Sequence, residues 1–120
     1  MKKLASALAA AAALTLAAGP AQADTRYYRV EANSTKWIDL TVCAPRISLR
    51  VQGDGDTDLD FTIYDPGNNV IYTDFDATDY TSTVFRTTIL PGEQRCTVYK
   101  LKVQNLGNVW NRFSVAIYNA

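Results

Sequence analysis

Apolar and polar residues alternate in short runs along the chain after Asp24. The run Arg46–Gln52 is the clearest example, because Ile47, Leu49 and Val51 occupy one phase and polar residues occupy the other. A period of two residues is the pattern of a β-strand with one buried face and one solvated face. After Asp24, no segment has apolar residues at the spacing of three to four that indicates an amphipathic helix. We therefore predict an all-β protein.

Turn-forming residues separate the alternating runs at 53–55, 65–69, 91–92 and 105–108. Short strands at this spacing, each with one apolar face, predict a single domain built as an antiparallel β-sandwich. About eight strands are expected, at 26–31, 36–42, 46–52, 59–64, 70–73, 82–89, 99–104 and 112–118. Their predicted inward-facing residues are Ile47, Leu49, Val51, Leu59, Phe61, Ile63, Tyr99, Leu101, Val103, Phe113, Val115 and Ile117.

Four tyrosines, Tyr64, Tyr72, Tyr80 and Tyr118, fall on the polar phase or in an acidic stretch, and we expect them to face outward. Exposed tyrosines suit the recognition of a protein or a polysaccharide. Tyrosines on a sheet also stabilise cross-strand pairs when no ligand is present. The sequence leaves both roles open, and it makes these four residues the candidate binding residues.

Residues 1–23 have the layout of a secretory signal peptide. Residues 1–3 are a short basic segment, 4–18 are apolar, and 21–23 are Ala-Gln-Ala, which suits cleavage before Asp24. A membrane anchor is the alternative, but the apolar stretch of about 15 residues is shorter than the roughly 20 that a span needs. We predict an exported protein, periplasmic or extracellular, with a mature domain at 24–120 and no membrane span after cleavage.

Charge and cysteine content narrow the possibilities further. Without residues 1–23 the chain has 10 basic and 12 acidic residues, which argues against a nucleic-acid partner. Cys43 and Cys96 are the only cysteines, and in an exported protein they predict one disulfide. This disulfide would close a loop of roughly 54 residues, and the entropy that the unfolded chain loses would stabilise the fold by about 4 kcal/mol. A redox-active pair would more typically have the spacing Cys-x-x-Cys.

Acidic residues are concentrated in one segment, because eight aspartates and no Lys or Arg lie between Asp54 and Asp79. Like charges held together repel unless a cation neutralises them. Calcium (Ca²⁺) takes six to eight oxygen ligands in flexible geometry, so it is the predicted cation. A solvated polar surface that discourages edge-to-edge aggregation is the alternative. The candidate metal ligands are Asp54, Asp56, Asp58 and Asp60, with help from Asp74, Asp76 or Asp79.

The segment 53–67, GDGDTDLDFTIYDPG, resembles the signature "DxDLDxxxYDxxG" of bacterial pre-peptidase C-terminal (PPC) domains. Segments 99–103 and 113–117 are similar to the last two strands of that family, so the resemblance covers roughly 47–118. It implies a jelly-roll-like β-sandwich of a kind usually appended to secreted peptidases. Some relatives bind calcium and fibrous substrates. This chain departs from the family in having no attached peptidase and in its two cysteines.

The chain contains no histidine, which excludes the usual Ser-His-Asp, Cys-His and His-zinc sites. A carboxylate-based hydrolase is a remote alternative, because a small sandwich offers little room for a deep cleft. We therefore predict that the protein is not an enzyme. The predicted function is an exported binding or accessory module, calcium-stabilised, that recognises a protein or polysaccharide. The alternative is a structural envelope or solubility-type protein with no small ligand.

Overall fold

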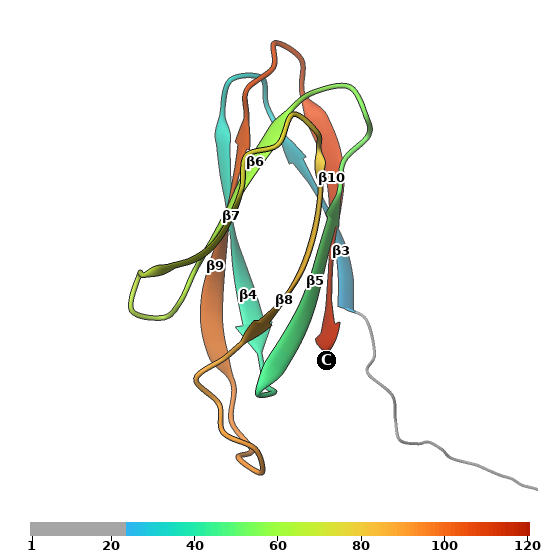
Figure 1. Ribbon diagram of the computed structural model, residues 1–120. Helices are drawn as coiled ribbons and strands as arrows, with labels where there is room; N and C mark the ends of the chain where they lie inside the picture. The colour runs from blue at the N-terminus through green and yellow to red at the C-terminus, as the bar shows by residue number, and fades with distance from the viewer. Residues whose placement is uncertain (1–23) are drawn as a thin grey trace, which may run out of the picture.

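The structure is a computed structural model that describes residues 24–120, so the predicted signal peptide lies outside the described residues. The described residues form eight strands and no helix, as the alternating pattern predicts (Figure 1). The strands are β3 (Asp24–Val30), β4 (Thr35–Val42), β5 (Arg46–Gln52), β6 (Leu59–Tyr64), β7 (Val70–Asp74), β8 (Tyr80–Arg86), β9 (Thr97–Asn105) and β10 (Asn111–Asn119).

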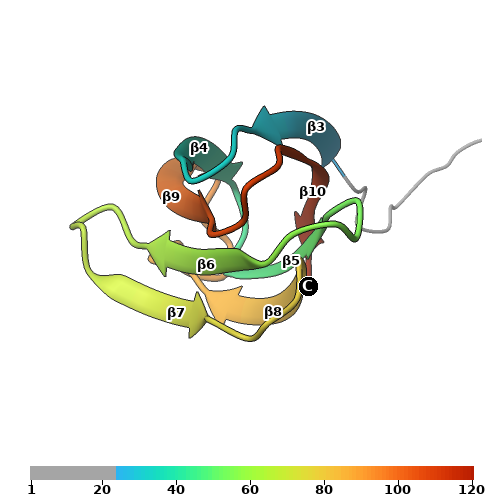
Figure 2. The ribbon, with the colours of Figure 1, turned by 90° about the horizontal axis from the view of Figure 1, so that it is seen from above.

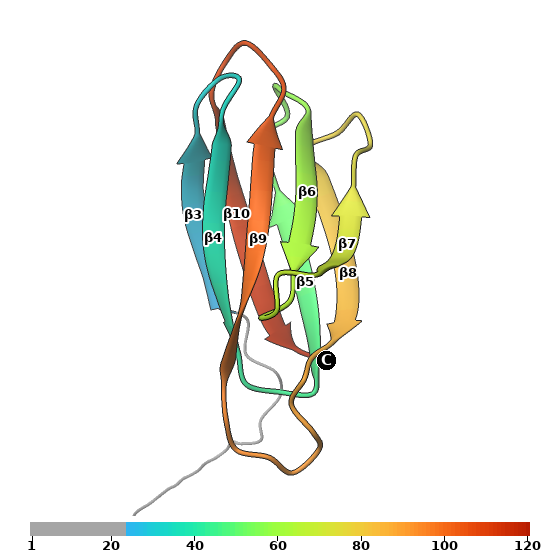
Figure 3. The same cartoon turned by 90° about the vertical axis from the view of Figure 1, so that its left-hand side faces the viewer.

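The strands form two four-stranded sheets, which pack face to face (Figures 2 and 3). One sheet has the order β3-β10-β5-β8, the other has the order β4-β9-β6-β7, and all paired strands are antiparallel. Consecutive strands cross between the sheets at every step except the β6–β7 hairpin. This is the connectivity of a jelly roll, in which two Greek keys share one core. The predicted antiparallel β-sandwich is therefore confirmed.

The core lies between the two sheets and follows the predicted phase in β5, β6, β9 and β10. Eleven of the twelve predicted core residues are buried, and Leu49, Leu59 and Leu101 have no exposed surface (0%). Ile117 is the exception, because it is only partly buried and packs against the core from its edge. The core also includes residues that the prediction did not name: Val30, Ile38, Leu40, Val42, Phe85 and Ile89.

The predicted strand at 82–89 is displaced, because β8 begins at Tyr80 and ends at Arg86. After Arg86 the chain leaves the sheet, and the backbone N–H of Thr87 donates to the carbonyl oxygen of Pro45 at 2.8 Å. Ile89 is nevertheless buried, with 2% of its surface exposed. Its apolar side chain therefore contributes to the core from a loop, which a strand pattern in the sequence cannot distinguish from a continuing strand.

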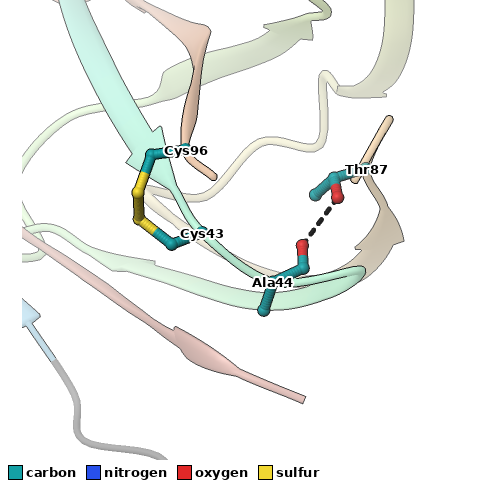
Figure 4. The surroundings of a disulfide bond; sticks show 4 residues. All are labelled: Cys43, Ala44, Thr87 and Cys96. Atoms are coloured by element: carbon teal, nitrogen blue, oxygen red, sulfur yellow. Dashed lines mark hydrogen bonds between the residues drawn. A yellow bond between two sulfur atoms is a disulfide. The ribbon is translucent and has the colours of Figure 1, made fainter. Parts of the chain in front are cut away.

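The predicted disulfide joins Cys43 to Cys96 (Figure 4). Cys43 follows β4 and Cys96 precedes β9, and the adjacent residues Val42 and Thr97 are a pair in the antiparallel register. The bond therefore continues the β4–β9 pairing beyond the sheet. Close by, the Thr87 hydroxyl donates to the carbonyl oxygen of Ala44 at 2.6 Å. These links hold both ends of the loop 87–96 against the sandwich.

Candidate functional site

The β5–β6 and β7–β8 loops meet at one end of the sandwich, the upper end in Figure 1. The Gly53 N–H donates to the carbonyl oxygen of Asp79 at 2.8 Å, and the Leu59 N–H donates to that of Thr78 at 3.0 Å. A Cβ atom at Gly53 would overlap the side chain of Asp79, so this close approach needs glycine. We call this region the acidic end, which comprises Asp54, Asp56, Asp58, Asp60, Asp74, Asp76 and Asp79.

One group of carboxylates surrounds the side chain of Asn111, the first residue of β10, which is fully buried. Its Nδ2 donates to Asp79 Oδ2 at 3.0 Å, to Asp56 Oδ1 at 3.4 Å and to the hydroxyl of Thr57 at 2.9 Å. Its Oδ1 accepts from the N–H of Asp54 at 3.4 Å. Asn111 is thus the hub of the acidic end, and no motif in the sequence singled it out.

The carboxyl groups of Asp54 and Asp56 interact directly. Their mutual hydrogen bond, followed by burial and the charge of Asp54, raises the pKa of Asp56 above its ordinary value. For Asp54, burial acts upward, but hydrogen bonds from Asp56 and from the N–H of Arg112 outweigh it and lower the pKa. The Arg112 N–H lies 2.9 Å from Asp54 Oδ2. Asp56 is therefore the member of the pair that holds a proton more readily.

A second group lies around the start of β6. Asp58 Oδ1 and Asp60 Oδ1 are both buried and have no hydrogen-bond partner among the described residues. Burial, followed by the charges of Asp58 and Asp74, raises the pKa of Asp60. Asp76 is exposed, and its N–H donates to Asp74 Oδ1 at 3.1 Å. This group therefore combines unpartnered buried carboxylate oxygens with repulsion between like charges.

The structure therefore gathers the seven candidate ligands at one end but divides them between two groups. In residues 24–120, no group of three or more His, Cys, Asp or Glu side chains is arranged to hold a metal ion. The donor set consists of carboxylate oxygens, which fits the chemistry of calcium. A calcium ion would need the side chains to move closer together, and the ligand assignment stays a prediction.

The four candidate binding tyrosines do not share one surface. Tyr64 is half-buried, and its ring lies 5.5 Å from that of Trp37 on the outer face of the β4-β9-β6-β7 sheet. Tyr80 is exposed and Tyr118 is half-buried, and both belong to strands of the opposite sheet. The expectation that Tyr72 faces outward is wrong, because it packs against the core.

Register explains the inward position of Tyr72. It pairs with Ile63 in the β6–β7 hairpin, and directly paired residues point to the same side of a sheet. Its hydroxyl lies 2.6 Å from the hydroxyl of Thr81 in β8, so it links the two sheets. The role of Tyr72 is therefore to join the open edges of the sandwich.

In comparisons with protein-family models and with curated proteins, no match to this chain was found. The structure places the PPC-like segment 53–67 across the β5–β6 loop, strand β6 and the β6–β7 turn. Residues 24–120 contain no helix that is long and apolar enough to cross a membrane.

Proposed function

We propose that this chain is an exported, non-catalytic binding or accessory module that recognises a protein or polysaccharide. The observation that carries this proposal is the exposure of large aromatic rings on the outer sheet faces: Tyr27 is 67% exposed, Trp37 54% and Tyr80 46%. Aromatic residues of this kind are enriched where proteins bind partners. The disulfide adds support for an oxidising compartment, where such bonds persist.

We further propose that calcium binds at the acidic end and stabilises the folded module. Two observations support this proposal. Asp58 and Asp60 each have a buried oxygen without a partner, which a bound cation would coordinate. The pKa of Asp60 is raised by burial and by neighbouring negative charges, which a bound cation would offset. The absence of Lys and Arg between residues 54 and 79 leaves no internal cation within the segment. Calcium would act by holding loops together, and no chemical step is assigned to it.

The resemblance of segment 53–67 to PPC domains supports the same proposal. In this interpretation the Asp-rich loop precedes a core strand, and the Tyr64-Asp65 pair opens the following hairpin.

The binding proposal is tested with the full chain, expressed with its own leader and purified after export. Surface plasmon resonance against a panel of neutral and anionic polysaccharides and extracellular proteins should show saturable binding to at least one of them. Trp37→Ala or Tyr80→Ala should weaken that binding. Leu90→Ala is the matched control, because Leu90 is 64% exposed but lies in the loop 87–96. Failure of every polymer and protein to bind would contradict the proposal.

A further inference from the structure

The outer face of the β3-β10-β5-β8 sheet has a charge pattern that the acidic end does not share. Five of the seven arginines in the described residues occupy outward positions of its strands, and no Asp or Glu does. Each of the five is exposed, and the alternation with buried residues such as Leu49 and Phe113 places them on the outer side. The five arginines are Arg29, Arg46, Arg50, Arg86 and Arg112.

The strand register places these arginines in three rows that run across the sheet, and we call each row of paired residues a level. Arg29 pairs with Arg112 across β3 and β10, and Arg46 pairs with Arg86 across β5 and β8. Arg50 lies between these levels, paired with Ala116, which is four residues from Arg112 along β10. At a rise of about 3.3–3.4 Å per residue, successive levels are about 13 Å apart.

Tyrosines occupy the levels between the arginines. Tyr27 pairs with Ser114, Ser114 pairs with Gln52, and Gln52 pairs with Tyr80, which places one tyrosine at each edge of that level. Tyr118 lies in the next gap, paired with Ser48. We call the surface formed by the five arginines with Tyr27, Tyr80 and Tyr118 the arginine–tyrosine face.

Most of these arginines form no ion pair within the part of the chain that the structure describes. Arg29 forms an ion pair with Glu31 at 2.8 Å and lies 4.3 Å from the ring centroid of Trp110. The other four form no ion pair with any residue in 24–120. The Arg112 guanidinium lies 6.0 Å from the ring centroid of Tyr27. A hollow of about 320 Å³ is lined by these arginine and aromatic side chains: Tyr27, Tyr28, Arg29, Trp110 and Arg112.

We infer that the arginine–tyrosine face binds an extended anionic polysaccharide through its carboxylate or sulfate groups. The guanidinium fork matches a planar or tetrahedral oxyanion and can donate two hydrogen bonds to it. Tyrosine adds a flat apolar ring with a polar tip, which suits a sugar ring and its hydroxyl groups. Regular levels along the strands favour a linear polymer. This inference rests on the proposed function, because a polysaccharide partner requires export.

Other anionic partners fit the face less well. A protein partner usually meets an apolar interface core, whereas the centre of this face holds the small or polar residues Ser48, Gln52, Ser114 and Ala116. Single-stranded nucleic acids bind in continuous basic grooves, whereas the arginine levels here lie about 13 Å apart on the outer face of a sheet. A membrane surface needs a broad apolar face, and Val84 is the one large aliphatic residue at the outward positions of these four strands.

Isothermal titration calorimetry with polygalacturonate, in buffer containing a calcium chelator, tests the inference. Fully methyl-esterified galacturonan is the neutral control, and dextran sulfate against dextran tests sulfate in place of carboxylate. Polygalacturonate or dextran sulfate should bind at least about tenfold more tightly than its neutral counterpart, since each charge-assisted contact contributes strongly. The affinity should fall as NaCl is raised to about 0.3 M, because the screening length shortens.

Variants locate the binding surface. Arg50→Gln and Arg86→Gln should each weaken binding about tenfold, as expected for the loss of a charge-assisted contact. Lys102→Gln removes the same charge from the outer face of the opposite sheet and should leave the affinity nearly unchanged. Melting temperatures of all three variants establish that they are folded.

Several results would overturn the inference. They are equal binding of the esterified or neutral polymer, an equal loss in Lys102→Gln, and equal or tighter binding of poly-glutamate or single-stranded DNA. If a neutral polysaccharide or a protein binds and Arg50→Gln has no effect, the proposed function stands and this inference fails. If no polymer or protein binds at all, both fail.

Discussion

Asn111 shows how one buried amide organises a charged region. Its side chain donates to two carboxylates and a hydroxyl, and it accepts from the Asp54 N–H. The Asn111 side chain is fully buried, whereas Asp54 and Asp56 are exposed, so these hydrogen bonds lie at the boundary between the core and solvent. Together with the bond from the Arg112 N–H to Asp54, these contacts join the β5–β6 and β7–β8 loops to β10.

Replacing Asn111 should therefore destabilise the fold. Asn111→Ala should cost about 1–3 kcal/mol in the free energy of unfolding, since it removes the hydrogen bonds of a buried amide that join the two loops to β10. Asn111→Asp should cost more, because it adds a carboxylate beside Asp56 and Asp79. Urea unfolding measures both. Asn108→Ala, at an exposed turn, is the control, and an equal loss in that variant would contradict the role of Asn111.

Phe61 tests the core itself. It is 1% exposed in the middle of the sandwich, and Phe61→Ala should cost about 3–5 kcal/mol, as truncations of buried aromatic residues do. Phe75→Ala removes the same atoms from a residue that is 61% exposed and should have little effect. Thermal unfolding by circular dichroism compares the two. A small loss for Phe61→Ala would mean that the core tolerates a cavity there.

At the scale of elements, the β6–β7 hairpin depends on its turn. Asp65 Oδ1 accepts from the N–H groups of Gly67 at 2.9 Å and Asn69 at 2.8 Å. Asn68 adopts a positive φ of 65°, a conformation that Asn tolerates better than most residues. The Asp65-Pro66-Gly67-Asn68-Asn69 turn expected from the sequence therefore forms, and its first side chain closes it.

The hairpin gives a pH-dependent prediction. The N–H of Asn69 is the largest of the hydrogen-bond contributions that lower the pKa of Asp65 below its model-compound value of 3.8. Asp65 therefore stabilises the folded state above about pH 4, and this contribution is lost as the pH falls through its lowered pKa. Asp65→Ala should lower the melting temperature at pH 7, and the difference from the unmodified protein should shrink below pH 4. Asp65→Asn, which keeps one acceptor, is the control. A difference that is independent of pH would contradict the role of the charge.

At the scale of the whole molecule, folding separates the charges instead of pairing them. Seven aspartates lie at the acidic end, while five arginines lie on the outer face of one sheet. The ion pairs in the described residues are all between exposed partners, and pairs of that kind contribute little to stability. Each charged region is therefore available to an external partner of opposite sign.

Calcium should raise the melting temperature through the acidic end. At a hundredfold excess over its Kd, an ion that binds only the folded state stabilises by about 2.7 kcal/mol. That corresponds to about 10–20 °C for a domain of this size. Asp58→Asn and Asp60→Asn should each reduce the shift. Asp39→Asn, whose carboxylate pairs with Lys100 elsewhere, should not.

Sodium chloride at matched ionic strength is the control for the calcium prediction, because screening differs from coordination. Differential scanning calorimetry measures the shift in both salts. A calcium shift no larger than the sodium shift would rule out the site, and the acidic end would then be a solvated surface.

The sequence by itself determined the strand content, the inward phase of most strands and the β6–β7 turn. These features depend on neighbours in the chain: a period of two separates the faces, and Pro66-Gly67-Asn68 favours a turn. The disulfide also followed from the sequence, because Cys43 has no partner except Cys96. The aspartates were recognisable as a cluster for the same reason, since they lie within 26 consecutive positions.

Tertiary structure decided everything that depends on which strands become neighbours. Jelly-roll connectivity brings β3, β5, β8 and β10 into one sheet, and this alone aligns five arginines that are scattered from Arg29 to Arg112. The same connectivity turns Tyr72 inward opposite Ile63 and brings Asn111 to Asp54, 57 residues away. Pairing between distant strands is set by the packing of the whole core, so no local pattern of residues contains it.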